Sequence, residues 1–455
     1  MEPGLFLELR RRRGGALLIV RAPKEESLPL DISVTPTLLQ VKSPQGCKEV
    51  SLPGGVTLVP SSCRGLQYVA GDGLHVRLQI LADSHSEAAP TLSQSVKAQE
   101  SCTFYCQTCG EVIIRERRFH RVLPLPSENW SALVDEWCCH PDPFANRELL
   151  PQENDCFVGD THFHLNLGDE LLEPGSEVTR KETHPPASES QPGQKPKANT
   201  RVICKRCKTL LGESTTSDSH PLAHGTTKLF VTEIIIKPSG QDFAIVPRSQ
   251  YVQSVFAQCL LELSSARSTF RFSIQGHDGK TYILMWLLNS DTMLVESLGN
   301  SEGSNVFTVF EDLLSPDSNS LEARDAIKVL YHPCIKNRNK ELASSWETDI
   351  GVHALTLPSK TCLELLVILS WSNRVLPSSL RYMNSFQFYA LLAGGTSPYI
   401  SFVKVTSLES WHPFELSDVY RTVRLLLHNL GWSNVLLLDA FSIKESRFKV
   451  AFLKL

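Results

Sequence analysis

Two Cys-x-x-Cys motifs constrain this chain more than any other feature of its sequence. They are Cys106-Gln-Thr-Cys109, which a glycine follows, and Cys204-Lys-Arg-Cys207, which a lysine follows. Two residues between the cysteines let both thiolates reach one tetrahedral ion, with Zn–S bonds of about 2.3 Å. Each motif follows a strand-like run and leads into hydrophobic residues, so we expect the two copies to share one local structure.

The four cysteines together predict one structural zinc ion. Four thiolates leave no position for a substrate, so the site is expected to be closed. Lys205, Arg206 and Lys208 would offset its negative charge. One alternative is a set of unrelated buried thiols. A thioredoxin-like redox pair fits less well, since neither motif opens a clear βαβ helix. A RING-type cross-brace is excluded, because eight paired ligands are not present.

The length and composition favour two folded lobes in a reducing compartment. A chain of 455 residues exceeds what one core usually supports. Its net charge of −4 argues against direct nucleic-acid binding. No stretch approaches the roughly 20 apolar residues that span a bilayer, and the N-terminus has the reverse of a secretory charge order. Its thirteen cysteines are therefore expected to be thiols or metal ligands rather than disulfides.

Residues 1–225 are expected to form a β-rich, zinc-clasped N-terminal lobe. Residues 5–9 and 16–20 flank the Gly14-Gly15 pair, which is a hairpin signal. Further short runs between glycine turns, such as 56–59 and 74–78, indicate a sandwich or meander. Zinc binding by both motifs would make the polar, Pro- and Ser-rich segment at about 168–200 a disordered insertion within this lobe.

Residues 226–455 are expected to form an α+β lobe with an antiparallel sheet. A strand at 229–236 precedes an amphipathic helix at 250–265. The Asp278-Gly279 pair predicts a hairpin turn between two further strands. Additional helices are expected at 305–314, 321–331, 361–373 and 417–430, and two strands within 435–455. The whole chain is thus assigned to the α+β class.

A stretch rich in tryptophan, cysteine and proline does not read as a core element. It contains Trp130, Trp137, Cys138, Cys139, His140, Asp142 and Phe144. Aromatic anchors between rigid prolines can bind a partner protein at low entropic cost. The alternatives are a second metal site or plain packing of the two thiols. The nearby His162 and His164 could join such a site, but we expect them to be surface residues.

Several long and uncommon strings carry a resemblance to a known family. They are this tract together with residues 58–67 (LVPSSCRGLQ), 264–272 (SSARSTFRF) and 357–365 (LPSKTCLEL). In these strings the chain closely resembles the ubiquitin-protein ligase type 3D family, whose members bind ubiquitin-conjugating enzymes and have a HECT-like domain. The resemblance runs from about residue 5 to Gln387, and residues 450–455 match the usual end. Residues 388–449 look like an extra segment.

The resemblance implies a ubiquitin-protein ligase that acts in the cytoplasm and nucleus. It would accept ubiquitin from a conjugating enzyme and transfer it to substrate lysines, with cyclin-type proteins among the substrates. It further implies inhibition of the zinc endonuclease that cleaves pre-mRNA before polyadenylation. The loop around Trp130, Trp137, His140, Asp142 and Phe144 would then place Cys139 on the metal of that nuclease. The rival interpretation is a non-catalytic inhibitor or assembly chaperone of the nuclease.

A HECT-type mechanism needs a nucleophilic cysteine near the end of the chain. Cys362 is the last cysteine and follows a threonine, but it precedes a leucine where such enzymes usually have phenylalanine. We expect Ser359 to cap a helix there, so that the helix N-terminus and Lys360 stabilise the thiolate. Alternatively, Cys362 is a small packed residue. A zinc hydrolase is not indicated, because no His-Glu-x-x-His motif is present.

Overall fold

The computed structural model describes residues 4–21, 31–43, 46–83, 96–125, 150–166, 176–179, 199–215, 226–240, 246–297, 320–334, 340–349, 351–383 and 448–454. Within these ranges the chain is mostly β-structure with three α-helices, so the expected α+β class is confirmed. No helix in the described part combines the length and the hydropathy needed to cross a membrane.

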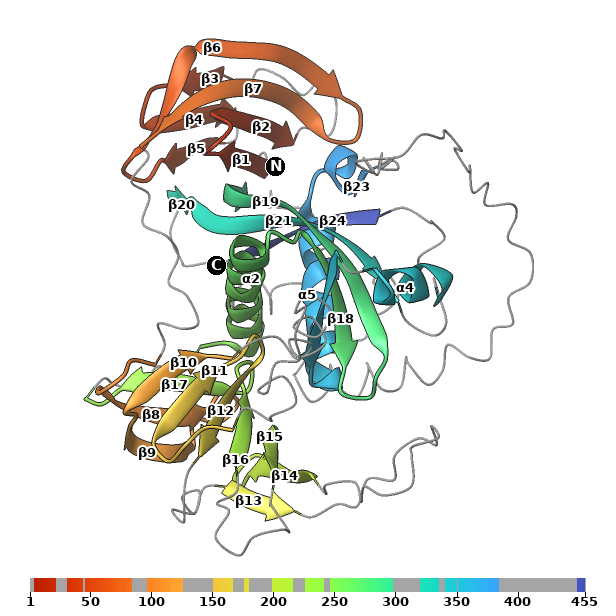
Figure 1. The fold of residues 1–455 in the computed structure, drawn as a ribbon. Helices are drawn as coiled ribbons and strands as arrows, with labels where there is room; N and C mark the ends of the chain where they lie inside the picture. Colours follow the sequence, from red (N-terminus) through yellow and green to blue (C-terminus); the bar gives the residue numbers. More distant parts are fainter. Residues whose placement is uncertain are drawn as a thin grey trace, which may run out of the picture.

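One ten-stranded sheet joins strands from the beginning, the middle and the end of the chain (Figure 1). Its main path runs, in spatial order, through β23 (Tyr382–Met383), β24 (Phe448–Lys454), β21 (Arg324–Pro333), β19 (Thr281–Ser297), β1 (Gly4–Arg10), β2 (Gly15–Arg21), β7 (Gly73–Ala82) and β6 (Val56–Val69). Off this path, β18 (Arg271–Gly276) pairs with β19, and in parallel with β22 (Val352–Leu357).

The β1–β2 hairpin forms where the two glycines predicted it. Leu5 pairs with Val20 and Leu9 pairs with Ala16. Gly14 has a φ of 60°, a left-handed conformation that glycine adopts without steric cost. On one face of this sheet, apolar side chains of β1, β2, β6 and β7 share a hydrophobic core with a second sheet. Each fully buried Leu or Val in this core contributes about 1.5–3 kcal/mol to the free energy of folding. That second sheet has the order β20 (Ser320–Glu322), β5 (Gly46–Ser51), β4 (Leu38–Ser43) and β3 (Asp31–Val34).

Two further sheets carry the cysteine motifs. The seven-stranded sheet has the order β10 (Arg121–Pro124), β11 (Asp155–Val158), β12 (His162–Asn166), β16 (Thr226–Phe230), β15 (Leu210–Thr215), β14 (Asn199–Cys204) and β13 (Ser176–Thr179). The three-stranded sheet has the order β17 (Ile234–Pro238), β8 (Ser101–Cys106) and β9 (Val112–Arg118). The chain passes from one sheet to the other through the turn at residues 231–233, between β16 and β17.

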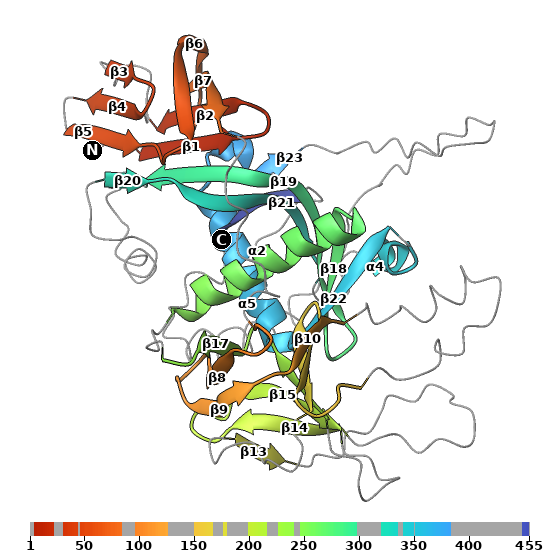
Figure 2. The same ribbon diagram turned by 60° about the vertical axis from the view of Figure 1, so that its left-hand side comes forward.

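Two long helices lie between the cysteine-bearing sheets and the ten-stranded sheet (Figure 2). They are α2 (Arg248–Arg267) and α5 (Ser359–Val375), which contact each other and β24. The apolar stripe expected for the first of them is buried, as Val252, Phe256 and Leu260 illustrate. The other helices in the described part of the chain are α4 (Lys340–Glu347) and the short 3-10 helix η3 (Ser378–Leu380).

A single hydrophobic cluster runs through this middle of the molecule. It includes Phe104 and Cys204 next to the cysteine motifs, Leu260 of α2, Phe272 of β18 and Cys362 of α5. The cysteine-bearing sheets and the two long helices therefore share one core, and a displacement on one side must be accommodated by the other.

Two secondary-structure expectations are wrong. The helix expected at 321–331 is instead the end of β20 followed by β21. Its residues have reasonable helix propensity, but β21 is paired on both sides, by β19 and β24, and tertiary pairing overrides propensity. The single strand expected at 229–236 is interrupted by the turn at 231–233. The helices expected at 305–314 and 417–430 and most of the segments 168–200 and 388–449 lie outside the described residues.

The expected boundary between residues 225 and 226 falls immediately before β16. The neighbours of β16 in its sheet, β12 and β15, come from the other side of that boundary. So do β8, which pairs with β17, and β1, which is one of the partners of β19. Strand pairing thus crosses the expected boundary, and the division into two lobes stays a prediction.

Candidate metal centre and the helix beside it

The two Cys-x-x-Cys motifs form the same tight turn. In both, the amide of the first cysteine donates to a carbonyl after the turn, and a later amide donates back to the carbonyl of that cysteine. The bonds are Cys106 N to Glu111 O and Gly110 N to Cys106 O, at 2.8 Å each, and Cys204 N to Thr209 O and Lys208 N to Cys204 O, at 2.9 Å each. Gly110 and Lys208 occupy equivalent positions with φ values of 73° and 60°. The expected likeness of the two motifs is confirmed.

The four sulfur atoms converge on one point between the turns. Cys106, Cys109, Cys204 and Cys207, called the cysteine clasp below, have all their sulfur atoms within 4.8 Å of one another. The Sγ atoms of Cys106 and Cys207 are 3.5 Å apart, and those of Cys109 and Cys204 are 3.6 Å apart. A zinc ion with four Zn–S bonds of about 2.3 Å requires sulfur separations of about 3.8 Å. The clasp therefore fits a tetrahedral metal ion.

Without a metal the clasp thiols have very different proton affinities. Burial raises the pKa of Cys109 to about 11 and raises the pKa of Cys106 further. Burial would also raise the pKa of Cys207, but its hydrogen bonds with the side chain and backbone of Thr209 outweigh burial and lower that pKa to about 7. Metal ligation needs all four thiolates, so ion binding must release protons from the buried members of the clasp.

One of the basic residues of the second turn contacts the first turn. Arg206 Nη1 donates to the backbone carbonyl of Cys109 at 3.3 Å and lies 4.0 Å from the Glu111 carboxylate. Thr209 Oγ1 also donates to Thr108 Oγ1 at 3.4 Å. Both contacts run from one cysteine turn to the other, so the turns are held together by more than the sulfur atoms.

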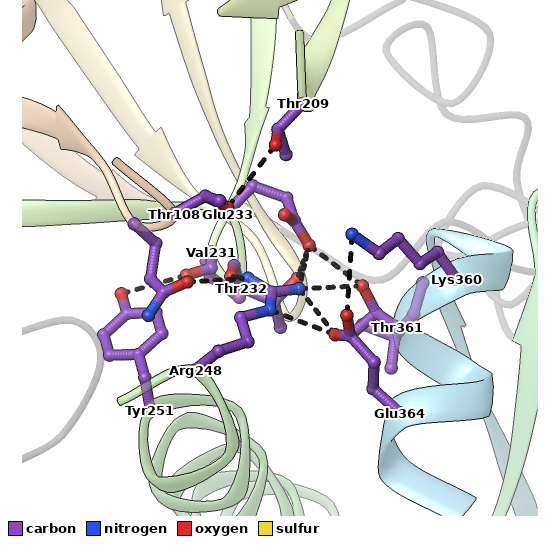
Figure 3. A network of polar contacts seen from close by, with 12 residues as sticks. Thr108, Thr209, Val231, Thr232, Glu233, Arg248, Tyr251, Lys360, Thr361 and Glu364 are labelled. Atoms are coloured by element: carbon purple, nitrogen blue, oxygen red, sulfur yellow. Dashed lines mark hydrogen bonds and ion pairs between the residues drawn. The ribbon is translucent and has the colours of Figure 1, made fainter. Parts of the chain in front are cut away.

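Directly beside the clasp is a buried polar network that sequence reasoning missed (Figure 3). Its centre is Arg248, at the start of α2, whose side chain is 15% exposed. Arg248 Nη2 lies 2.6 Å from Glu233 Oε1 and 2.9 Å from Glu364 Oε2. Burial lowers the pKa of Arg248, but the two carboxylates raise it well above its ordinary value. We call Gln107, Thr232, Glu233, Arg248, Thr361 and Glu364 the Arg248 network.

One sequence signal could have revealed part of this network. In α5 the buried positions Thr361, Leu365 and Leu369 follow helical spacing, and Glu364 falls on the same stripe. A carboxylate on an apolar stripe requires a buried cation or donor. The identity of that cation, more than a hundred residues away, was not readable from the sequence.

Cys362 lies in the first turn of α5 and is fully buried. Its Sγ is 3.5 Å from the carbonyl oxygen of Gln275, and burial raises its pKa to about 12. The expected stabilised thiolate is therefore wrong. Ser359 does not cap the helix either, because its hydroxyl donates to Asp278 Oδ1 at 3.1 Å. The role of Cys362 as a ubiquitin acceptor stays a prediction.

The two histidines expected at the surface are buried. His162 and His164 on β12 are 7% and 4% exposed, so that expectation is wrong. Neither belongs to a metal-binding group among the described residues. Burial lowers the pKa of His162 to about 3, so it is neutral at physiological pH.

The tract that contains Trp130, Trp137, Cys139, His140, Asp142 and Phe144 lies outside the described residues, but both of its flanks are described. Arg121 in β10 donates to both Asp155 carboxylate oxygens in β11, at 2.9 and 2.7 Å. The Leu125 amide donates to the Val158 carbonyl at 2.8 Å. The chain segments on either side of the tract are therefore paired at one edge of the seven-stranded sheet.

Comparison with known proteins gives close relatives. The model of the family described as HECT-like ubiquitin-conjugating enzyme (E2)-binding matches residues 8–388. Proteins named as E3 ubiquitin-protein ligases of type 3D are 61% identical in Bos taurus, 59% in Pongo abelii and 58% in Homo sapiens, each over 386 residues. Each alignment covers 85% of this chain and 97% of the relative. No solved structure matches.

The family match spans the cysteine clasp, the Arg248 network and Cys362, so these three features lie in the shared region. This agrees with the resemblance in the sequence strings. The chain belongs to the HECT-like ubiquitin-conjugating enzyme (E2)-binding family.

Proposed function

We propose that this chain binds a ubiquitin-conjugating enzyme in the cytoplasm and nucleus and promotes transfer of its ubiquitin to substrate lysines. The observation that carries the proposal is the family match over residues 8–388, supported by relatives that are named as E3 ubiquitin-protein ligases. Cyclin-type proteins are the substrates that the sequence resemblance suggests.

Cys362 is the acceptor in this proposal. A thiol receives ubiquitin by attacking the thioester of the charged conjugating enzyme, whose cysteine leaves as a thiolate. The attacking Sγ must be accessible and deprotonated, whereas Cys362 is buried under the β18–β19 turn with a raised pKa. Transfer through Cys362 therefore requires the N-terminal turn of α5 to open. Direct transfer from the conjugating enzyme to lysine is the competing route.

A thioester assay separates the two routes. Charged conjugating enzyme is mixed with the full chain, and products are resolved on non-reducing gels with and without added thiol. We expect a thiol-sensitive ubiquitin adduct that Cys362→Ala abolishes and the half-buried Cys334→Ala retains. Lysine ubiquitination that survives Cys362→Ala would show that Cys362 is not the acceptor and would favour direct transfer.

The ion that we propose for the cysteine clasp is zinc, in a structural role. An all-thiolate, tetrahedral donor set suits zinc, and the sulfur separations of 3.5 and 3.6 Å between opposite turns fit its bond lengths. Zinc would neutralise the clasp thiolates and close the two turns on each other. It would take no part in ubiquitin chemistry, because its four positions are filled by the chain.

A second candidate function is inhibition of the zinc endonuclease of pre-mRNA 3′-end processing. The described flanks support it, because Leu125 before the tract and Val158 after it are hydrogen-bonded to each other at one sheet edge. A thiolate at Cys139 would bind a nuclease zinc more tightly than water or phosphate does. Asp142 would mimic the RNA phosphate.

Nuclease pull-down and inhibition with Cys139→Ala test this candidate, with Cys138→Ala as the matched control. We expect Cys139→Ala to lose nuclease binding while its zinc content and melting temperature stay those of the wild type. Normal nuclease binding by Cys139→Ala, or outright misfolding of that variant, would contradict the inhibitory mechanism.

A further inference from the structure

The Arg248 network physically connects the cysteine clasp to the helix that carries Cys362. Gln107 lies inside the first cysteine turn and is 3% exposed. Its Oε1 accepts from Arg248 Nη1 at 3.2 Å, and its backbone amide donates to the Glu233 carbonyl at 3.0 Å. On the neighbouring strand, Ile234 of β17 pairs with Cys106 itself. The position of Glu233 is thus fixed by the first cysteine turn, which carries Cys106 and Cys109 of the clasp.

On the other side, the network holds the first turns of α5. Arg248 Nε donates to Glu364 Oε2 at 3.0 Å, and Arg248 Nη2 lies 3.3 Å from Thr361 Oγ1. The Thr361 hydroxyl also donates to Glu233 Oε1 at 2.9 Å. Thr361 immediately precedes Cys362, so the residue beside the buried thiol is hydrogen-bonded to the residue beside the clasp (Figure 3).

These bonds depend on one another. Arg248 is the shared donor for two carboxylates, for the Thr232 carbonyl and for Gln107. If the first cysteine turn moves, Gln107 and the 231–233 turn move with it, and Glu233 and Glu364 no longer share one well-placed cation. A buried network of this kind is stable only when all its members are satisfied.

We propose that metal occupancy of the clasp controls whether the N-terminal turn of α5 stays packed so that its Cys362 is buried, and that Arg248 is the positioning residue that transmits this coupling. With the metal bound, the N-terminal turn of α5 stays packed and the Cys362 thiol stays buried. When the metal is removed, the turn opens locally and Cys362 becomes reactive. The inference rests on the proposed metal site and is independent of ubiquitin transfer.

The test is thiol labelling of the full-length, zinc-loaded protein with iodoacetamide, read residue by residue by mass spectrometry. Zinc content is measured first, and EDTA then removes the metal. We expect EDTA to raise the labelling rate of Cys362 about tenfold or more, because the reactivity of a buried thiol follows the population of its open form. Cys259, which is buried in α2, serves as the internal control and should stay protected.

Variants of Arg248 then distinguish a loss of coupling between the clasp and Cys362 from a general loss of protein stability. In Arg248→Met, Cys362 should be labelled rapidly even when the protein is loaded with zinc. The ratio of its labelling rates with and without EDTA should therefore fall towards one. Arg248→Lys keeps the charge but reaches fewer partners, so its labelling should be intermediate. Arg271→Met is the matched control, because Arg271 pairs with Asp349 at 2.7 Å outside the network.

Gln107→Leu provides the decisive variant if Arg248→Met fails to fold. It removes the contact between the cysteine turn and Arg248 without leaving a buried charge unpaired. We expect it to retain zinc and to show the same reduced EDTA effect. Protein that contains no zinc would overturn the metal site and the coupling together. Zinc loss with unchanged Cys362 labelling, or equal labelling of Cys259, would overturn the coupling alone.

Discussion

Glu8 lies on β1 in the interior of the ten-stranded sheet with none of its surface exposed. Burial raises the pKa of its carboxyl, but hydrogen bonds from Arg10 and the charge of Lys328 outweigh burial and lower the pKa below its usual value. Lys328 Nζ contacts both Glu8 oxygens, at 3.0 and 3.1 Å. This carboxylate therefore joins the beginning of the chain to β21.

We predict that Glu8→Gln lowers the free energy of unfolding by about 3 kcal/mol at neutral pH, since it leaves Lys328 without its buried counter-charge. The folded-state pKa lies below the unfolded value near 4.5, so this stabilisation is present above pH 4.5 and is lost as the pH falls through the folded pKa. Urea unfolding of both proteins across this range should show the difference shrinking in acid.

The exposed Glu49 provides the control for this measurement. Its carboxylate accepts a solvent-exposed hydrogen bond from Gln40, so Glu49→Gln should change stability by less than about 0.5 kcal/mol. A difference between Glu8→Gln and the wild type that is constant from neutral pH to strong acid would contradict the assignment of the effect to this carboxyl group.

A second prediction at this scale concerns the clasp. Cys106→Ser should reduce zinc content from about one ion per chain to near zero and lower the melting temperature, because metal binding is linked to folding. Cys102, in the same strand and 4% exposed, lies outside the clasp, so Cys102→Ala should keep its zinc. Zinc-free wild-type protein with cooperative unfolding would contradict the metal site.

Among the individual elements, β15 packs against β16 at one especially close point. Gly212 pairs with Leu229, and a methyl group on Gly212 would meet the Lys228 carbonyl, with the Lys228 carbon at 2.9 Å and the Leu229 Cα at 3.0 Å. These are backbone atoms of a paired strand, which cannot turn aside as a flexible side chain can. The strand after the second cysteine turn thus requires glycine here.

Gly212→Ala should therefore destabilise the protein by about 2 kcal/mol or more in urea unfolding, since the two strands must separate. Gly15→Ala is the matched control in another strand, because no atom lies within 4 Å of the added methyl group. If both variants unfold at the same urea concentration, the close approach of β15 and β16 does not limit stability.

Elements with strong local signals were predictable from the sequence, and those fixed by distant partners were not. The hairpin at Gly14-Gly15, helix α2 and the paired cysteine turns all follow from spacing within a short window. By contrast, β21 becomes a strand only because β19 and β24 flank it. The Arg248 network unites residues from four separate segments, so no local pattern specifies it.

In the whole molecule, the sheets connect the two halves of the chain. Six consecutive residues from Leu5 to Arg10 pair with β19, and β12 and β15 pair with β16. Removal of either half would leave unpaired strand edges, which aggregate readily.

We therefore predict that neither residues 1–225 nor residues 226–455 fold when expressed alone, whereas co-expression gives a soluble complex. Size-exclusion chromatography and thermal unfolding followed by circular dichroism would check this. A monomeric 226–455 fragment with a sharp, cooperative melting transition would contradict it and would show that the second lobe folds independently.

The pairing of β1 with β19 also sets the order of events during synthesis. β1 pairs at once with β2, yet its second partner, β19, which pairs Ser297 with Leu5, emerges roughly 290 residues later, or about 15–60 seconds at ordinary elongation rates. β24 follows about 150 residues after β19. The nascent chain therefore carries an incomplete ten-stranded sheet until β24 has emerged, and a chaperone that shields strand edges should associate with it over that interval.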